Sequence, residues 1–313
     1  MIHLKDLLIN FGHETPKTVV VPFAHDPDII CSIAQAMVMK IARFILIGEE
    51  HKIRDAANRN RVDISAAEFV PATTEEQACD LAAAMAGEKR AQIMIKGQVQ
   101  SATFIKAILQ KKNDLIQVGQ LISGAALFEI PSYHKLLLIT DPSVNIAPNL
   151  EQKIEIIRNA ISIMHHLGIA RPKVACVEAV EKVKPKIPGT VEAQTLVELG
   201  RQGRFGEAEV DGPFGFDVAI ARRAAEIKGI KSPVAGDADI LLLPQLVTAN
   251  VLYKSFVWCA KGTAASIISG ARVPIVLPSR SDSEETKLFS IALAVCLSKR
   301  ENAPAPRDNN AHL

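Results

Sequence analysis

Short runs of aliphatic and β-branched residues recur along the chain, and within each run apolar residues follow one another without alternating with polar ones. The runs are TVVVPFA from Thr18, RFILIG from Arg43, IMIKG from Ile93, KLLLITD from Lys135, KVACVEAV from Lys173, DILLLP from Asp239 and VPIVLPS from Val273. Continuous apolar character is typical of strands buried on both faces of a parallel sheet. The pattern therefore predicts a parallel sheet.

Stretches of helical periodicity separate these runs. In the segment that starts at Asn149, the residues Ile154, Ile157, Ile161 and Met164 follow at intervals of three and four, which places them on one face of a helix. Alternation of such helices with strands predicts an α/β fold.

Three segments interrupt the alternation. Residues 115–141 contain several strand-like runs with turn signals and no room for helices, so we expect antiparallel strands and the start of a second domain. Residues 201–216 are rich in glycine and indicate a loop or edge region over a cleft. The polar, proline-bearing tail, residues 301–313, is expected to fray.

Composition excludes several classes of protein. Lys and Arg total 36 against 34 Asp and Glu among 313 residues, and this near balance argues against a nucleic-acid binder. The five cysteines form no CxxC pair, so neither a disulfide framework nor a structural zinc site is expected. No uncharged apolar run approaches the ~18–20 residues of a membrane span, and we expect a cytoplasmic protein.

Common catalytic signatures are missing from the sequence. It contains no phosphate loop, no G-x-G-x-x-G after a strand, no H-E-x-x-H and no G-x-S-x-G. The neighbouring His165 and His166 cannot chelate a metal from one helix face. We therefore expect neither a metal site nor a bound nucleotide cofactor.

The segment from Val273 to Leu297 carries the strongest local chemistry. Its buried strand ends at Pro278, and a helix begins near Ser281 or Ser283, where Ser281-x-x-Glu284 has the form of a capping box. Capping explains the acidic residues but not Arg280, a cation at the unfavourable end of a helix dipole and beside a strand terminus. Arg280 is either an anion-binding residue or part of a structural salt bridge.

Two further strand ends carry polar residues. Asn250 and Lys254 lie four positions apart on a predicted helix, so they share one face, with Tyr253 beside them. This face either binds a polar ligand or is solvated. Asp141 and Asn145 follow another strand and either face a ligand or form a turn.

Together these segments resemble the phosphate acetyl/butyryltransferase family, and its butyryl branch more than its acetyl branch. The resemblance runs from about Val19 to Lys299, and the stretches that carry it are IMIKGQV, FEIPSYHKLLLITDPSVNIAPNLEQKIEIIRNA, KVACVEAVEKVKPKIPGTVEA, SPVAGDADILLLP, NVLYKS and PIVLPSRSDSEETKLFSIALA. It implies two α/β domains flanking a cleft, in an isocitrate-dehydrogenase-like or phosphate acyltransferase fold. We expect a discontinuous first domain of residues 1–120 and 271–313, and a second domain of residues 121–270.

The implied reaction is the reversible transfer of a short acyl group, with butyryl favoured, between CoA and inorganic phosphate in a ternary complex. The implied partners are acyl-CoA, phosphate and acyl phosphate, without cofactor or metal, in a homodimer or higher homo-oligomer. Alternatives are a phosphate acetyltransferase, a metal-using dehydrogenase-like relative on the same fold, and a catalytically idle CoA-binding protein.

The resemblance also implies roles for single residues. Ser279 and Arg280 match the family's catalytic Ser-Arg pair, in which Arg280 would hold phosphate. The acetyl branch has an acidic base seven positions after this serine, whereas this chain has Thr286. Asp282, Glu284 or Glu285 would replace that base, or the protein supplies none.

Further candidates for binding phosphate or CoA are Lys96, Lys106, Asn145, Asp237, Asn250, Tyr253 and Lys254. Lys106 lies near the position where the acetyl branch carries an arginine for phosphate. Ala249 stands where the family pattern has glycine, which puts the local backbone geometry in question.

Overall fold

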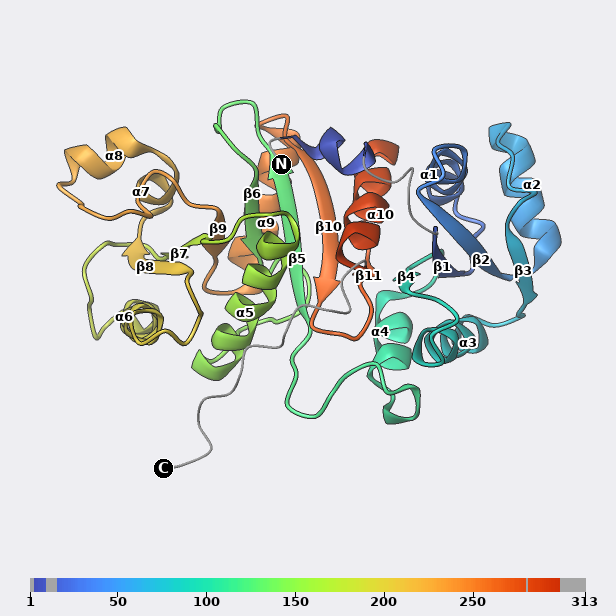
Figure 1. Cartoon of the computed structure of the whole chain (residues 1–313), viewed down its shortest axis with the longest axis horizontal. Helices are drawn as coiled ribbons and strands as arrows, with labels where there is room; N and C mark the ends of the chain where they lie inside the picture. The colour runs from blue at the N-terminus through green and yellow to red at the C-terminus, as the bar shows by residue number, and fades with distance from the viewer. Residues whose placement is uncertain (1–2, 10–15, 280, 299–313) are drawn as a thin grey trace.

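The computed structural model describes residues 3–9, 16–279 and 281–298. These residues form eleven strands: β1 (Lys17–Pro22), β2 (Ala42–Gly48), β3 (Glu68–Pro71), β4 (Ile93–Ile95), β5 (Ser123–Glu129), β6 (Leu137–Thr140), β7 (Lys173–Val177), β8 (Glu209–Phe214), β9 (Ile240–Leu242), β10 (Thr263–Ser269) and β11 (Ile275–Val276). They make one sheet in the order β3-β2-β1-β4-β11-β10-β5-β6-β9-β7-β8 (Figure 1).

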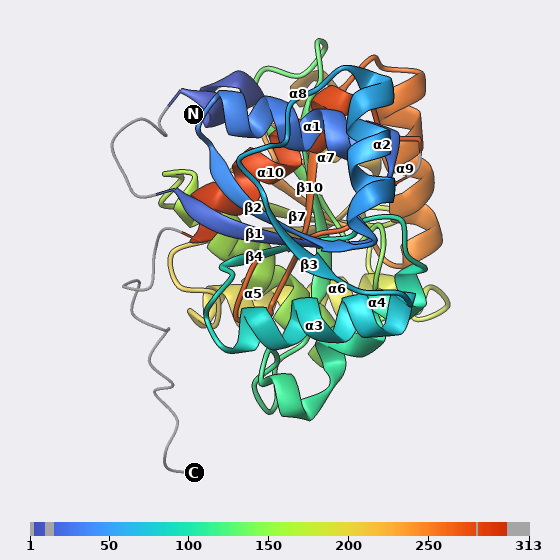
Figure 2. The ribbon, with the colours of Figure 1, turned by 90° about the vertical axis from the view of Figure 1, so that its right-hand side faces the viewer.

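The helices cover both faces of this sheet. In the described residues they are η1 (Leu4–Leu8), α1 (Pro27–Val38), α2 (Glu50–Asn60), α3 (Glu75–Gly87), α4 (Ser101–Leu109), η2 (Lys111–Asn113), α5 (Leu150–His166), α6 (Pro188–Arg201), α7 (Phe216–Ile220), α8 (Arg222–Ile227), α9 (Leu246–Trp258) and α10 (Glu284–Ser298). Figure 2 shows α1 and α2 on one side of β1, β2 and β4, with α3 and α4 on the other. None of the described helices is long and apolar enough to span a membrane.

The predicted strands are confirmed, because each of the seven apolar runs contains one. Pairing is parallel for β1 with β2 and β4, for β4 with β11, and for β9 with β6 and β7. The expected antiparallel segment is also confirmed, since β5 pairs antiparallel with β6 and with β10. The glycine-rich segment, residues 201–216, contains β8, which is an edge strand as predicted.

The predicted helix after Asn149 is α5. The Asn149 side chain accepts a hydrogen bond from the Gln152 N–H at 2.9 Å, and the Gln152 side chain accepts one from the Asn149 N–H at 3.0 Å. This reciprocal cap satisfies two backbone donors that the first helical turn would leave unpaired. The buried face of the helix includes Ile154, Ile157 and Ile161, as the periodicity predicted.

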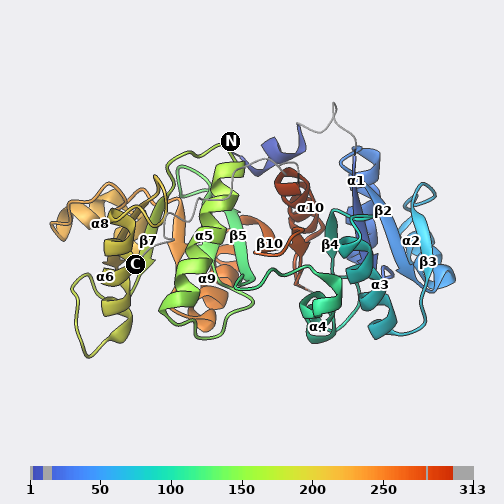
Figure 3. The ribbon, with the colours of Figure 1, turned by 60° about the horizontal axis from the view of Figure 1, so that its bottom comes forward.

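A seven-residue antiparallel pairing of β5 with β10 lies at the middle of the sheet, where Thr263 pairs with Glu129 and Ser269 with Ser123. Helix α10 packs against β10 and also against α1, and Figure 3 shows it between β10 and β4. Hydrogen bonds join all eleven strands into one sheet. The division of the chain into two domains stays a prediction. The expected frayed tail, residues 301–313, lies outside the described residues.

A network of ion pairs lies at the amino ends of β7 and β9. The Asp237 carboxylate contacts Lys173 Nζ at 2.6 Å, His134 Nε2 at 2.8 Å and Lys135 Nζ at 3.0 Å. Lys135 Nζ also lies 2.6 Å from Asp239 Oδ1. Burial alone would raise the pKa of Asp237, but the hydrogen bonds from Lys173, His134 and Lys135 outweigh it and hold this pKa well below its usual range. The network therefore stabilises the fold most when Asp237 is ionised.

We expect Asp237→Asn to lower the free energy of unfolding by about 1–3 kcal/mol at pH 7, because charge-assisted hydrogen bonds are lost. Since the pKa of Asp237 is lower in the folded state, its contribution is complete above the unfolded value of about 3.9 and is lost as the pH falls below it. Urea denaturation from pH 7 downward should show the two proteins converging below about pH 4. Asp63→Asn, an exposed control whose amide oxygen can still accept the Ser65 N–H, should change stability by less than about 0.5 kcal/mol. Equal stability of Asp237→Asn and wild type at pH 7 would contradict this account.

Candidate active site

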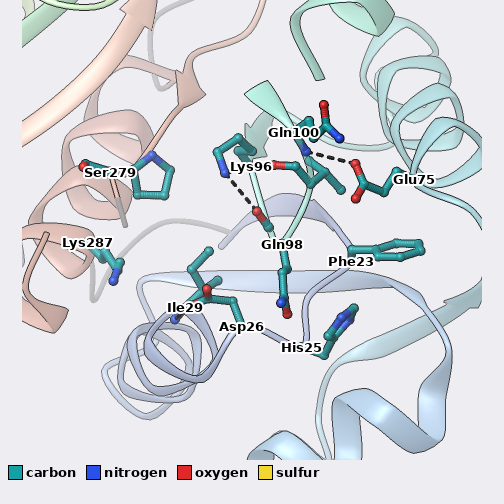
Figure 4. A pocket seen from close by; sticks show the side chains of 13 residues that line it. Phe23, His25, Asp26, Ile29, Glu75, Lys96, Gln98, Gln100, Ser279 and Lys287 are labelled. Atoms are coloured by element: carbon teal, nitrogen blue, oxygen red, sulfur yellow. Dashed lines mark hydrogen bonds between the residues drawn. The ribbon is translucent and has the colours of Figure 1, made fainter. Parts of the chain in front are cut away.

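A cavity of about 520 Å³ lies at the carboxyl ends of three neighbouring parallel strands, β1, β4 and β11. Loops that follow these strands supply His25, Lys96 and Ser279, and helix α10 supplies Lys287 (Figure 4). The carboxyl ends of parallel strands are where open α/β sheets bind their ligands. Position and size therefore mark this cavity as the candidate active site.

The loop after β4 fits against the loop after β1 because residue 97 is glycine. A Cβ atom on Gly97 would lie 2.1 Å from the Pro22 carbonyl oxygen and 2.5 Å from that of Phe23. The Gln98 N–H donates to the same Phe23 oxygen at 2.9 Å. This close approach brings Lys96, only 8% exposed, to the cavity wall, where its Nζ donates to the carbonyl oxygens of Gly97 at 3.1 Å and Val99 at 3.2 Å.

A second, smaller cavity of about 90 Å³ lies beside the first. Helix α9 contributes Asn250, Tyr253 and Lys254 to it, so the predicted shared face of this helix does line a cavity. Ser279 lines both cavities. The residue that follows β11 therefore stands between the two spaces.

The Asp282 carboxylate fixes the position of Ser279. Its Oδ2 accepts the Ser279 N–H at 2.7 Å, and its Oδ1 accepts the Tyr253 hydroxyl at 2.9 Å. Asp282 is 8% exposed, and burial raises its pKa, while the Ser279 N–H and the Tyr253 hydroxyl oppose that shift. Burial, together with the negative charge of Asp282, raises the pKa of Tyr253, so its hydroxyl keeps the donated proton. Both carboxylate oxygens are thus engaged in holding the loop.

Lys287 joins this loop to the first helix of the chain. Its Nζ donates to the Asp282 carbonyl oxygen at 2.9 Å and lies 3.0 Å from Asp28 Oδ2 on α1. The sequence analysis did not identify Lys287. A lone lysine in the otherwise uncharged stretch KLFSIALAV was the available signal.

Helix α10 begins two residues later than the predicted capping box implied. The Thr286 N–H donates to Ser283 Oγ at 3.1 Å, which makes Ser283 the cap, whereas the Ser281 hydroxyl lies 3.1 Å from Ser279 Oγ. The Ser283 hydroxyl also donates to Thr286 Oγ1 at 3.1 Å. Thr286 is buried, while Glu285 is exposed on the first helical turn. The Ser281-x-x-Glu284 capping box was therefore wrong, although the alternative start near Ser283 is confirmed.

Three predicted binding residues do not line either cavity. Lys106 is exposed on α4. The Asn145 amide donates to the Ile122 carbonyl oxygen at 2.9 Å and to Asp141 Oδ2 at 2.6 Å, so the loop itself uses it. Asp237 belongs to the charge network at the amino ends of the strands, away from their carboxyl ends.

Two remaining expectations concern Ala249 and Arg280. Ala249 is fully buried inside α9 and has no positive φ, so the helix does not need a glycine there. Arg280 lies outside the described residues. The preceding residue, Ser279, lines both cavities.

The described residues contain no group of three or more His, Cys, Asp or Glu side chains placed to hold a metal ion. Two carboxylates that line the large cavity instead accept hydrogen bonds from the backbone. Asp26 caps α1 through the Asp28 and Ile29 N–H groups, and Glu75 accepts the Gln100 N–H at 2.9 Å. The polar lining is therefore held in place by the fold itself.

An α/β sheet with a ligand-sized cavity at the ends of its parallel strands is typical of enzymes that act on small molecules. The family described as phosphate acetyl/butaryl transferase matches residues 4–86 and 73–295. The chain belongs to this family of acyltransferases, which confirms the family and the fold inferred from the sequence.

Individual relatives agree with this assignment. The chain is 38% identical over 296 residues to a probable phosphate butyryltransferase of Bacillus subtilis, covering 95% of this chain and 98% of that protein. It is 36% identical over 287 residues to a phosphate acetyltransferase of Thermotoga maritima, covering 92% and 97%. The crystal structure of a branched-chain phosphotransacylase from Enterococcus faecalis V583 superposes with a TM-score of 0.80 at 31% identity, covering 90% and 99%.

We expect Asp282→Ala to lower the free energy of unfolding by about 1–3 kcal/mol, because the Ser279 N–H and the Tyr253 hydroxyl lose their common acceptor. Chemical denaturation measures this loss directly. Glu285→Ala is the matched control, since it removes an exposed carboxylate from the same turn and should change stability by less than about 0.5 kcal/mol. If both variants melt like the wild type, the Asp282 carboxylate does not hold this loop.

Proposed function

We propose that this protein catalyses the reversible reaction of a short-chain acyl-CoA with inorganic phosphate to give an acyl phosphate and CoA. The observation that carries the proposal is the place of Ser279, which the family resemblance pairs with Arg280 as catalytic and which lies between two adjoining cavities. Two substrates that react in one ternary complex need adjoining spaces that meet at the reacting atoms.

In this reaction a phosphate oxygen attacks the thioester carbonyl carbon, and the carbonyl electron pair moves onto oxygen. When the carbonyl forms again, the carbon–sulfur bond breaks and CoA leaves as a thiolate, which then takes up a proton. Arg280 is proposed to hold the phosphate and to offset the negative charge that develops on oxygen. The Ser279 hydroxyl is proposed to donate a hydrogen bond to the thioester group. No step requires a metal or a bound cofactor.

Asp282 is proposed to position Ser279 and not to act as a base. Its two carboxylate oxygens already accept the Ser279 N–H and the Tyr253 hydroxyl, which supports this role. Thr286 has no acidic group, and its hydroxyl accepts the Ser283 hydroxyl. The reaction is therefore proposed to proceed without a carboxylate base at position 286.

The proposed assembly comes from the family resemblance, and the proposed location comes from the composition of the sequence. We propose a homodimer or higher homo-oligomer that works in the cytoplasm, where acyl-CoA and phosphate are the substrates. Neither nucleic acid nor a membrane is a proposed partner, in keeping with the near balance of charge.

Replacement of the catalytic pair tests the proposal. Arg280→Gln should lower kcat for acyl phosphate formation by ~10²–10³, because one preorganised electrostatic donor is lost. Ser279→Ala should cost about tenfold to a hundredfold, because one neutral hydrogen bond is lost. Release of free thiol from butyryl-CoA in the presence of phosphate is the measurement. Wild-type kcat and phosphate KM in Arg280→Gln would overturn the assignment of the site.

The dependence of kcat/KM on the chain length of the acyl group provides a second test. The proposed preference for a four-carbon acyl group comes from the closer resemblance to the butyryl branch. Two extra methylenes at ~0.8 kcal/mol each should favour butyryl-CoA over acetyl-CoA by about fifteenfold in kcat/KM. We expect a maximum at butyryl-CoA in a series from acetyl- to valeryl-CoA. A maximum at acetyl-CoA would place the protein in the acetyl branch.

A further inference from the structure

The small cavity beside Ser279 contains a hydroxyl group that the fold leaves without a partner. Ser266 lines this cavity from β10, and its Oγ is buried and has no hydrogen-bond partner among the described residues. Buried hydroxyl groups are normally paired, because an unpaired one costs free energy. The Ser266 hydroxyl is therefore a polar group that whatever fills the small cavity has to meet.

The strand fixes the position of Ser266. Its N–H donates to Ser290 Oγ on α10 at 2.9 Å, and its backbone pairs with Ala126 of β5. Side chains alternate between the two faces of a strand, so Ser266 and Ile268 point to the same face, and both line the small cavity. Burial raises the pKa of Tyr253, and the Ser266 hydroxyl opposes this rise, which places the two residues side by side.

Size decides which part of the proposed acyl-CoA lies in the small cavity. With the thioester beside Ser279, the CoA part needs the space of about 520 Å³, and the acyl group beyond the thioester falls in the space of about 90 Å³. Leu277 and Ile268 give the small cavity apolar walls. The charged residues described there do not oppose an acyl chain, because both Asp282 oxygens accept protein donors and Lys254 is exposed.

We propose that Ser266 limits the length of the acyl group that this protein transfers. This inference rests on the proposed function. Water can pair with the Ser266 hydroxyl while the cavity holds a short acyl group. An aliphatic chain that reaches Ser266 displaces this water and has neither a donor nor an acceptor, so the hydroxyl is left unpaired. The hydroxyl therefore selects against longer chains.

Two substitutions of Ser266 should move the chain-length preference in opposite directions. The measured quantity is the ratio of kcat/KM for valeryl-CoA to that for propionyl-CoA. Ser266→Ala removes the hydroxyl and should raise this ratio about tenfold, because a long chain no longer leaves a buried hydroxyl unpaired. Ser266→Thr keeps the hydroxyl and adds a methyl group, so it should lower the ratio about fourfold, the value of one buried methylene. A ratio that does not rise in Ser266→Ala, or does not fall in Ser266→Thr, overturns the proposal.

Ser269→Ala is the matched control. It removes a hydroxyl from the same strand, but Ser269 lies three positions further along, points to the opposite face and lines a different cavity. The ratio should stay at the wild-type value in this variant. An equal rise in Ser269→Ala would show a general effect on β10 and overturn the assignment to Ser266.

Calorimetric titration with S-pentyl-CoA and S-propyl-CoA separates this inference from the proposed function. These thioethers have no carbonyl group and cannot react, so their relative affinity reports the chain-length preference without turnover. We expect the affinity for S-pentyl-CoA relative to S-propyl-CoA to rise in Ser266→Ala and to fall in Ser266→Thr. If the wild type transfers no acyl group but shows this pattern, the proposed function fails and the role of Ser266 stands. If neither variant changes the relative affinity, the role of Ser266 fails whatever the activity.

Discussion

The buried carboxylate of Asp282 links the loop between β11 and α10 to helix α9. One of its oxygens holds the Ser279 N–H, and the other holds the hydroxyl of Tyr253 on α9. Lys287 extends the link to Asp28 on α1. A buried carboxylate is costly unless its oxygens are paired, so the donors around Asp282 support one another. The position of Ser279 between the cavities depends on all of them.

This link explains why the cavities adjoin. The large cavity is built at the ends of β1, β4 and β11, whereas the small one includes residues of α9 and β10. Strand β11 is only two residues long, and it pairs in parallel with β4 and antiparallel with β10. Because it lies between the parallel β4 and the antiparallel β10, the loop that follows it reaches both cavities. A ligand that fills both spaces therefore contacts the Ser279 loop from each side.

Strand positions were predictable because buried parallel strands are continuously apolar. The sequence analysis did not identify β10, although it lies near the centre of the sheet, because TAASIIS contains small and hydroxyl-bearing residues that are weak strand signals. The roles of Asp282 and Lys287 were not predictable either. Lys287 meets Asp28 across 259 positions of the chain, and no local pattern encodes such a contact. Asn145 shows the reverse case, since a polar residue at a strand end was assigned to a ligand but serves its own loop.

The threonine at position 286 has different consequences for the two directions of the proposed reaction. When acyl-CoA reacts with phosphate, CoA leaves as a thiolate, so no group on the protein has to remove a proton from sulfur. In the opposite direction CoA must be deprotonated before it attacks the acyl phosphate. A thiol with a pKa of about 8.5 is about 3% ionised at pH 7, so a site that supplies no base would slow this direction by about thirtyfold at most. That factor shrinks as the pH rises toward 8.5, whereas the acyl-phosphate-forming direction has no such dependence.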